Sequence, residues 1–387
     1  MNTFNLKPKY YFGDTALEGL STELKRKKFK KAYIIYGQNS IKENKIYDEI
    51  IDILHKENLN YAEFEGIEPN PKDSTILKAI EHGEKNEIDL IIAVGGGSVI
   101  DASKVIATLI TNKNKYPSVW DYVTNPKNLG QLPIPIISII TLAGTASENN
   151  ACSVITNDLK KWKASVIQPY AIPYVAIINP KYTFTVNEWQ TASGIFDCFS
   201  HLLEQFFGKE TFGWTKEIIY ANLKVLWKYG KIVLKEPTNY EARANVLWTT
   251  TMSLNGITSF NSDSDWTVHL IEHAFSGIWN ITHGAGLALI TPIYLEVRVN
   301  REQWFCEKLN MIGKELFNTT SPSETINLIK NFILSLNLPL KWNQFKEIID
   351  FTPQNETDLL EHIMRFGGTE EHKEMYQEII TKIKENI

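Results

Sequence analysis

Short runs of apolar, largely β-branched residues alternate with amphipathic stretches through the first half of the chain. The clearest runs occupy residues 32–36, 90–94, 134–140 and 174–178, with a weaker run at 61–64. Between them, residues 41–55, 77–85 and 98–109 carry apolar side chains at helical spacing. Buried strands that alternate with helices are typical of a mostly parallel sheet covered on both faces. The pattern predicts an α/β nucleotide-binding domain over residues 1–184.

After residue 180, long helical patterns replace the strand-like runs. They cover residues 189–207, 215–229, 240–254, 266–278, 302–317, 324–335 and 376–387. Few alternating runs interrupt them, and there is no internal repeat. The pattern predicts an all-helical domain over residues 185–387, with a boundary near residues 180–188.

Composition narrows the class of protein. The chain has 387 residues, 43% of them hydrophobic and 22% charged, and a net charge of -5, which fits a globular protein without a nucleic-acid partner. The first residues lack a signal-peptide pattern, and no apolar run approaches the roughly 20 residues that span a bilayer, so we expect a cytoplasmic protein. The three cysteines are widely spaced and form no CxxC pair, which argues against a disulfide framework or a thiolate metal site.

A triple glycine lies between a predicted strand and a predicted helix. Gly95, Gly96 and Gly97 let the backbone approach an anion closely, at a position where helix N–H groups can receive a phosphate. Ser98 can cap the helix, and Asp101 completes the capping pattern Ser-x-x-Asp. The alternative is an ordinary tight turn between strand and helix, and the GxGxxG spacing is absent.

A second polar loop, TLAGTASE at residues 141–148, follows another apolar run. Its hydroxyl and small residues can bond a ribose or a phosphate, although a polar connection with a helix cap is the plainer interpretation. Two such loops after neighbouring strands favour a ligand site, because ligands of open α/β sheets bind at the carboxyl ends of strands.

Four of the eight histidines fall in two short stretches of the helical half. Asp197 and His201 are four residues apart, as are His269 and His273, so each pair shares one face of a helix. By pattern alone these four residues are the preferred metal ligands. His283 complicates the choice, because it opens the next helix and its imidazole can also turn inward. A single histidine here is more simply a hydrogen-bonded core residue, but the whole cluster indicates a metal site.

The motifs together resemble those of one enzyme family. The segments are GGGSVIDASK, TLAGTASE, GIFDCFSHLLEQ and DWTVHLIEHAFSGIWNITHGAGLA. They are similar to the iron-containing (group III) alcohol dehydrogenases, especially the butanol dehydrogenase branch, over nearly the whole chain. The resemblance implies a dehydroquinate synthase-like fold. It also implies that the metal is bound by Asp197, His201, His269 and His283, while His273 lies near the nicotinamide and is not a ligand.

The same resemblance implies the cofactor contacts. Gly95 to Ser98 would bind the pyrophosphate, and Asp101 is expected to contact the cofactor as well. The nicotinamide half would contact Thr141, Leu142 and Thr145, with Asn150 and Lys163 as further contacts.

The segment after the first apolar run bears on the choice between NADH and NADPH. It reads Gly37, Gln38, Asn39, Ser40, Ile41, Lys42. NAD-preferring relatives often carry an acidic residue here, whereas this segment has no carboxylate to repel a 2′-phosphate, and Ser40 with Lys42 can bind one. We therefore expect NADP(H) to be preferred over NAD(H). The alternative is that these residues only start a helix, with Ser40 as its cap.

The expected reaction is the reversible reduction of an aldehyde to a primary alcohol, with butanal as a typical substrate, by hydride from NAD(P)H. The metal would polarise the carbonyl oxygen, and His273 would deliver the proton through a ribose hydroxyl or water. The family name favours Fe(II), although the ligand set also permits Zn(II) or Ni(II). The family implies a homodimer.

Two other classes remain open. A dehydroquinate synthase-like or glycerol dehydrogenase-like enzyme would share the fold and the metal. The metal-binding segments contain no lysine or arginine for a phosphorylated acidic substrate, which disfavours the synthase. A non-catalytic nucleotide sensor would explain the glycine loop, but it would not need four metal ligands.

Overall fold

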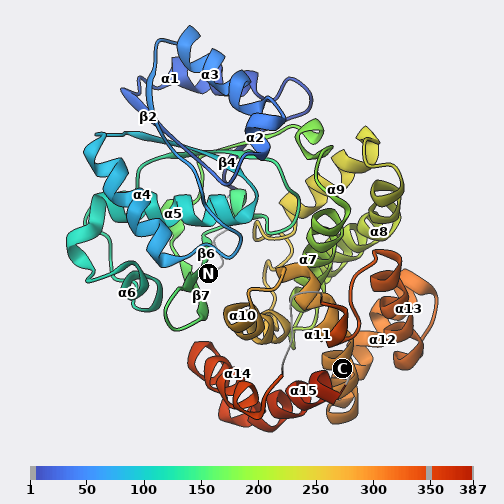
Figure 1. Ribbon diagram of the computed structural model, residues 1–387. Helices are drawn as coiled ribbons and strands as arrows, with labels where there is room; N and C mark the ends of the chain where they lie inside the picture. The colour runs from blue at the N-terminus through green and yellow to red at the C-terminus, as the bar shows by residue number, and fades with distance from the viewer. Residues whose placement is uncertain (1–5, 346–350, 386–387) are drawn as a thin grey trace. The chain divides into compact units, whose positions relative to one another are not determined.

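The computed structural model describes residues 6–345 and 351–385 (Figure 1). The chain folds into two compact units. The α/β unit comprises residues 6–186 and 237–255, and the helical unit comprises the described residues of 187–236 and 256–385. The chain therefore returns to the α/β unit once after leaving it.

A six-stranded parallel sheet forms the centre of the α/β unit, as the apolar runs predicted. In spatial order its strands are β1 (Lys9–Phe12), β8 (Val175–Ile178), β5 (Ile136–Ile140), β4 (Leu90–Gly95), β2 (Lys31–Tyr36) and β3 (Asn60–Phe64). The four inner strands are almost wholly buried, because helices cover both faces. Strand β5 begins just after Pro135, which has no N–H for a sheet ladder.

Helices lie on both sides of this sheet (Figure 1). Those of the α/β unit are α1 (Glu18–Arg26), α2 (Ser40–Glu43), α3 (Ile46–Lys56), α4 (Asp73–Lys85), α5 (Gly97–Asn112), α6 (Val119–Thr124) and α9 (Tyr240–Met252). The apolar faces of α1 and α3 pack on one face of the sheet, in a core that includes Leu20, Ile50 and Ile92. The single helix expected over residues 41–55 is wrong. Lys45 has a left-handed backbone, with φ of 62°, and separates α2 from α3.

Two strand features were not among the expected elements. The residues of edge strand β1 are exposed or only partly buried, and the strand carries no apolar run. Strands β6 (Cys152–Asn157) and β7 (Trp162–Ile167) form an antiparallel hairpin outside the main sheet. Polar or charged residues interrupt both strands of the hairpin. A search for apolar runs therefore does not detect these strands.

The helical unit contains only helices and short 3-10 turns among its described residues. Its helices are α7 (Glu188–Phe206), α8 (Gly213–Lys235), α10 (Thr267–Trp279), α11 (His283–Arg301), α12 (Gln303–Phe317), α13 (Pro322–Ser335), α14 (Pro353–Phe366) and α15 (Lys373–Glu385). Residues 386 and 387, expected in the last helix, lie outside the described residues. Helices α7 and α11 pack very closely, because a Cβ on Gly284 would lie 2.0 Å from the carbonyl oxygen of Ser193. This contact places the first turn of α11 beside the second turn of α7.

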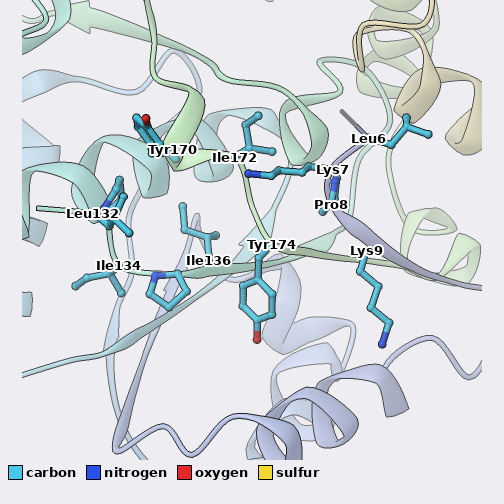
Figure 2. Close-up of a pocket in the computed structure, with 13 residues that line it drawn as sticks. Leu6, Lys7, Pro8, Lys9, Leu132, Ile134, Ile136, Tyr170, Ile172 and Tyr174 are labelled. Carbon is cyan, nitrogen blue, oxygen red and sulfur yellow. The ribbon is translucent and has the colours of Figure 1, made fainter. Parts of the chain in front are cut away.

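A surface pocket in the α/β unit opens near the amino ends of β1, β5 and β8 (Figure 2). It is lined by residues 6–9, 132–136, 170–172 and 174. The glycine loop lies at the other edge of the sheet, after the carboxyl end of β4. Ligands of open α/β sheets bind at that carboxyl edge, so we do not assign this pocket to the reaction. Within the described part of the chain, no helix is both long and apolar enough to cross a membrane.

Candidate active site

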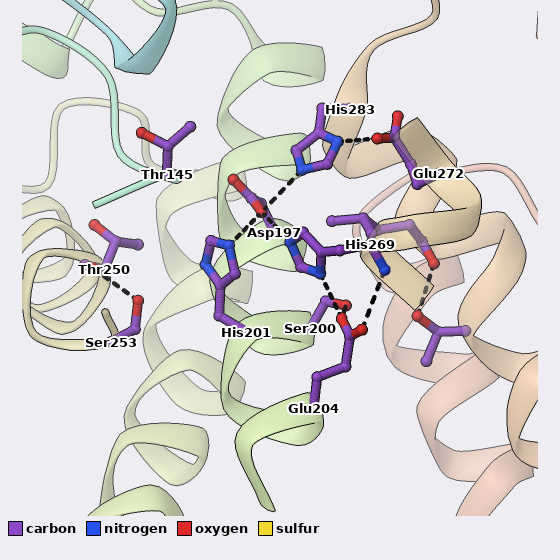
Figure 3. Close-up of polar contacts among 12 residues, drawn as sticks. Thr145, Asp197, Ser200, His201, Glu204, Thr250, Ser253, His269, Glu272 and His283 are labelled. Atoms are coloured by element: carbon purple, nitrogen blue, oxygen red, sulfur yellow. Dashed lines mark hydrogen bonds and ion pairs between the residues drawn. The ribbon is translucent and has the colours of Figure 1, made fainter. Parts of the chain in front are cut away.

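Three imidazoles converge on one carboxylate oxygen in the helical unit (Figure 3). Helix α7 carries Asp197 and His201 one turn apart, α10 carries His269, and α11 begins at His283. The Nε2 atoms of His201, His269 and His283 lie 3.2, 3.5 and 3.7 Å from Asp197 Oδ1. Residues from three helices thus aim their ligand atoms at one point.

The donor set fits a divalent cation. Among the described residues, Asp197 Oδ1 and His269 Nε2 are buried and have no hydrogen-bond partner. Leaving such atoms unpaired costs free energy unless something binds them. Ligand atoms of Asp197, His269 and His283 all lie within 4.8 Å of one another. Imidazole nitrogen with carboxylate oxygen is a set that iron and zinc accept.

His273 lies close to this cluster, one turn after His269 on α10. Its ring centroid is 5.6 Å from that of His283 and 6.3 Å from that of His269. It also belongs to a second group of potential ligand atoms, with Glu272 and His283. The structure therefore brings all five of the residues singled out by the sequence into one region, and Asp197 is surrounded by His201, His269 and His283.

Two buried carboxylates orient these imidazoles, and the sequence analysis missed both. Glu204 on α7 lies 2.5 Å from His269 Nδ1 and also accepts a bond from the His269 backbone N–H. Glu272 on α10 bonds Nδ1 of His283 on α11. When Nδ1 donates its proton to a carboxylate, the Nε2 lone pair is left facing Asp197. Each glutamate thus holds the histidine of the next helix in the cluster.

A sequence signal for these carboxylates was present. The pattern His-Leu-x-Glu occurs at residues 201–204 and again at residues 269–272. The repeat places a glutamate one turn after a histidine in both helices. The sequence does not show which histidine each glutamate bonds, because that histidine lies on a different helix.

Burial and neighbouring charges shift the pKa values of the cluster in opposite directions. Burial, together with the nearby imidazoles, lowers the pKa of His201 to about 3. Burial also opposes a charge on His269, but the Glu204 and Asp197 carboxylates outweigh it and raise the pKa of His269 to about 10. Burial would raise the pKa of Asp197, yet the three histidines hold it well below its usual range. Asp197 is therefore an anion that attracts a cation.

The glycine loop joins β4 to α5 in the α/β unit. Gly96 is the N-cap of α5, without a side-chain cap, and Ser98 lies inside the helix. The expectation that Ser98 caps this helix is therefore wrong. The uncapped first-turn N–H groups of α5 suit an anion such as a pyrophosphate.

The second loop touches the first, as expected for a shared ligand site. A Cβ on Gly97 would lie 2.2 Å from the Thr145 hydroxyl, and a Cβ on Gly96 would lie 3.1 Å from Leu142. The Thr141 N–H donates to the Gly95 carbonyl at 3.2 Å. Glycine is required at residue 97 because a larger residue would separate the two loops.

Polar side chains beneath these loops bond other protein groups. The oxygens of Asp101 accept bonds from the Ser147 hydroxyl at 2.5 Å and the Val154 N–H at 2.9 Å. Asn150 bonds the Ala146 carbonyl through its Nδ2 atom. Asp101 thus ties α5 to the second loop and to the hairpin, so its expected cofactor contact would have to compete with these bonds. Lys163, on β7, is buried.

A carboxylate lies beside the segment that was expected to bind a 2′-phosphate. Glu65, which follows β3, has its Oε2 atom 3.0 Å from Lys42 Nζ. The segment of residues 37–42 contains no acid, but the structure places this carboxylate from a different segment beside Lys42. Adjacent strands bring together residues that are far apart in the sequence.

Comparisons with known proteins identify the family of this chain. The family model "Iron-containing alcohol dehydrogenase" matches residues 7–180, and the model "Fe-containing alcohol dehydrogenase family, C-terminal" matches residues 191–347. The chain is 36% identical over 344 residues, 87% of each chain, to NADH-dependent butanol dehydrogenase A of Clostridium acetobutylicum. It is 30% identical over 349 residues, 88% of each chain, to NADPH-dependent aldehyde reductase YqhD of Escherichia coli.

Solved structures agree with the sequence relatives. The crystal structure of NADH-dependent butanol dehydrogenase A from Thermotoga maritima matches with a TM-score of 0.90 at 27% identity, covering 98% of each chain. The fold and the expected family are thereby confirmed. The chain belongs to the iron-containing alcohol dehydrogenase family and is similar to its butanol dehydrogenases.

Proposed function

We propose that this oxidoreductase interconverts primary alcohols and aldehydes, with hydride carried by NAD(P)H and one divalent metal ion in its helical unit. The observation that carries the proposal is the convergence of three imidazole nitrogens on Asp197 Oδ1, in a chain of this family. A non-catalytic nucleotide sensor would have no use for this convergent donor set.

Asp197, His201, His269 and His283 would hold the metal, and we propose Fe(II) as the physiological ion. When bound, the ion supplies Lewis-acid polarisation of the carbonyl oxygen. Asp197 contributes a full negative charge, because its pKa is held low. Asp197, His201 and His269 are buried, and their burial strengthens the electrostatic interactions of the cluster.

The two loops of the α/β unit would bind the cofactor. The amides of residues 95–98 would receive the pyrophosphate, and Thr141, Leu142 and Thr145 would contact the nicotinamide half. Asn150 and Lys163 are proposed as further contacts. The cofactor, when bound, would supply the hydride for the carbonyl carbon, and the reduced oxygen would need a proton. His273 would supply that proton, because its side chain is only partly buried beside the cluster.

We propose that Ser40 and Lys42 give NADPH the advantage over NADH, as expected from residues 37–42. Gly37, Gln38 and Asn39 connect the carboxyl end of β2 to α2. The cytoplasm is the proposed location and a homodimer the proposed assembly. Sedimentation of the purified enzyme would test the assembly.

A single assay tests the function. Protein stripped of metal and reloaded with Fe(II) or Zn(II) is given aldehydes of increasing chain length with NADPH or NADH, and absorbance at the nicotinamide band is followed. We expect aldehyde-dependent oxidation only in metal-loaded protein, with the higher kcat/KM for NADPH. No oxidation with any aldehyde and either metal would refute the proposal, and a higher kcat/KM for NADH would refute the cofactor preference alone.

A further inference from the structure

The loops that follow β2 and β3 lie side by side at the carboxyl edge of the sheet. The two strands are paired from Lys31 with Asn60 through Ile35 with Phe64. Just beyond that pairing, the Gly66 N–H donates to the Gly37 carbonyl at 2.7 Å. Glu65 is consequently a neighbour of the segment of residues 37–42, although more than 20 residues separate them in the sequence.

Lys42 and Glu65 form an ion pair at this edge. Lys42 Nζ lies 3.0 Å from Glu65 Oε2, and the same carboxylate oxygen accepts a bond from the Tyr36 hydroxyl at 3.2 Å. The ammonium of Lys42 also lies over the ring of Tyr36, 5.1 Å from its centroid. Hydrogen bonds and the charge of Lys42 hold the pKa of Glu65 below its usual range, so Glu65 is an anion at neutral pH.

The pair remains accessible to a ligand. The side chains of Lys42 and Glu65 are 39% and 63% exposed. Strand β2 lies between β3 and β4, and β4 leads into the glycine loop. If the pyrophosphate binds at the glycine loop, as the proposed function requires, the adenosine ribose extends toward the end of β2.

Resting on that function, we propose that Glu65 is a specificity-determining residue that limits the preference of the enzyme for NADPH. Glu65 competes with the 2′-phosphate of NADPH for Lys42 and repels that phosphate directly. NADH has no group at the 2′ position that needs Lys42. Glu65 therefore weakens NADPH binding and leaves NADH binding nearly unchanged.

The chain offers a matched control on β3, close to Glu65. Glu63 lies two residues before Glu65, and its carboxylate accepts bonds from the Tyr47 hydroxyl at 2.7 Å and the Tyr36 hydroxyl at 3.4 Å. The ion pair of Lys42 is with Glu65. Glu63→Gln removes the same charge as Glu65→Gln from a position about one strand repeat away. A general change in surface charge would act similarly in both variants.

The experiment measures binding by calorimetry, without any reaction or metal. The probes are adenosine 2′,5′-bisphosphate and AMP, which differ only in the 2′-phosphate, together with NADPH and NADH. For Glu65→Gln we expect the bisphosphate and NADPH to bind about threefold to tenfold more tightly, with AMP and NADH changed less than about twofold. The gain should shrink at high salt, because the pair is exposed.

Two further variants identify the cause. Glu63→Gln should leave the ratio of bisphosphate to AMP affinity within about twofold of wild type. Lys42→Met should weaken bisphosphate binding, and Glu65→Gln should produce a smaller gain in the Lys42→Met background than in wild type. An equal gain in Glu63→Gln, or an undiminished gain without Lys42, would overturn the proposed competition.

The same experiment distinguishes failure of the proposed role of Glu65 from failure of the proposed oxidoreductase function. Nucleotides that bind normally, with an unchanged bisphosphate-to-AMP ratio in Glu65→Gln, would overturn the role of Glu65 and leave the oxidoreductase function intact. Failure of every nucleotide to bind to any variant would overturn the proposed cofactor site and the role of Glu65 with it.

Discussion

His269 and His273 lie one turn apart on α10, yet their surroundings differ. His269 is buried between Asp197 and Glu204, whereas His273 is less buried and lies beside His283. Helical spacing in the sequence gives no reason to assign the two histidines different roles. Whether His273 or His283 is the third histidine depends instead on where α11 begins. Helix packing decides that position, and the spacing of residues along α10 does not show it.

This difference leads to a prediction about metal content. His269→Ala should lose most of its metal, because it removes a nitrogen that faces Asp197 and leaves Glu204 without its imidazole partner. His273→Ala should keep its metal and lose roughly 100-fold or more of its turnover, the usual effect of removing a general acid. Metal per chain from mass spectrometry, with kcat on the same samples, measures both.

His362→Ala is the control, since His362 is a buried histidine on α14 in the same unit. It should keep both its metal and its turnover, so that any loss in His269→Ala is specific to the cluster. A metal-free His273→Ala protein would contradict the separation of roles between the two histidines.

At the scale of elements, the cluster depends on bonds between helices. Glu204 on α7 bonds a histidine of α10, and Glu272 on α10 bonds a histidine of α11. Both glutamates are buried, at 1% and 0% exposed. They hold two of the imidazoles in one orientation while those imidazoles remain free to bind through Nε2.

We predict that Glu272→Gln lowers metal affinity by about 10-fold to 100-fold, because a neutral amide is a weaker partner for the His283 N–H. Competition against a chelating dye measures this affinity on protein stripped of metal. Glu296→Gln is the control, since Glu296 is a partly exposed residue of α11 that pairs with Lys330. If both variants bind metal as wild type does, Glu272 is a structural residue only.

The elements themselves were predictable to different degrees. The inner strands β2, β4, β5 and β8 are buried on both faces, so their apolar runs were visible in the sequence. Strand β1 and the hairpin of β6 and β7 are partly polar, and only tertiary pairing makes them strands. Long amphipathic helices such as α12 were found nearly to the residue, because one apolar stripe faces the core.

At the scale of the whole molecule, the metal should contribute to stability. The metal-free cluster contains a buried anionic Asp197 and buried atoms without hydrogen-bond partners among the described residues. A ligand present at about 100 times its Kd stabilises a fold by about 2.7 kcal/mol. We therefore predict that chelation lowers the Tm by about 5 to 10 °C, given about 2 to 4 °C per kcal/mol for a unit of this size.

Scanning calorimetry of wild type with and without a chelator measures this shift, and added Fe(II) or Zn(II) should reverse it. His269→Ala should show the lower Tm in both conditions. An identical Tm for wild type before and after chelation would mean that the cluster does not hold a metal under these conditions.

The return of the chain to the α/β unit limits how the enzyme can be divided. Trp248, on α9, packs edge-on against Tyr10 and Phe12 of β1, at centroid distances of 5.6 and 5.2 Å. A gene fusion that exchanges cofactor-binding halves between relatives by one cut near residue 186 would separate these rings. Such a chimera needs two further junctions, near residues 237 and 255, so the α/β unit can be inherited intact only as two separate stretches of the gene.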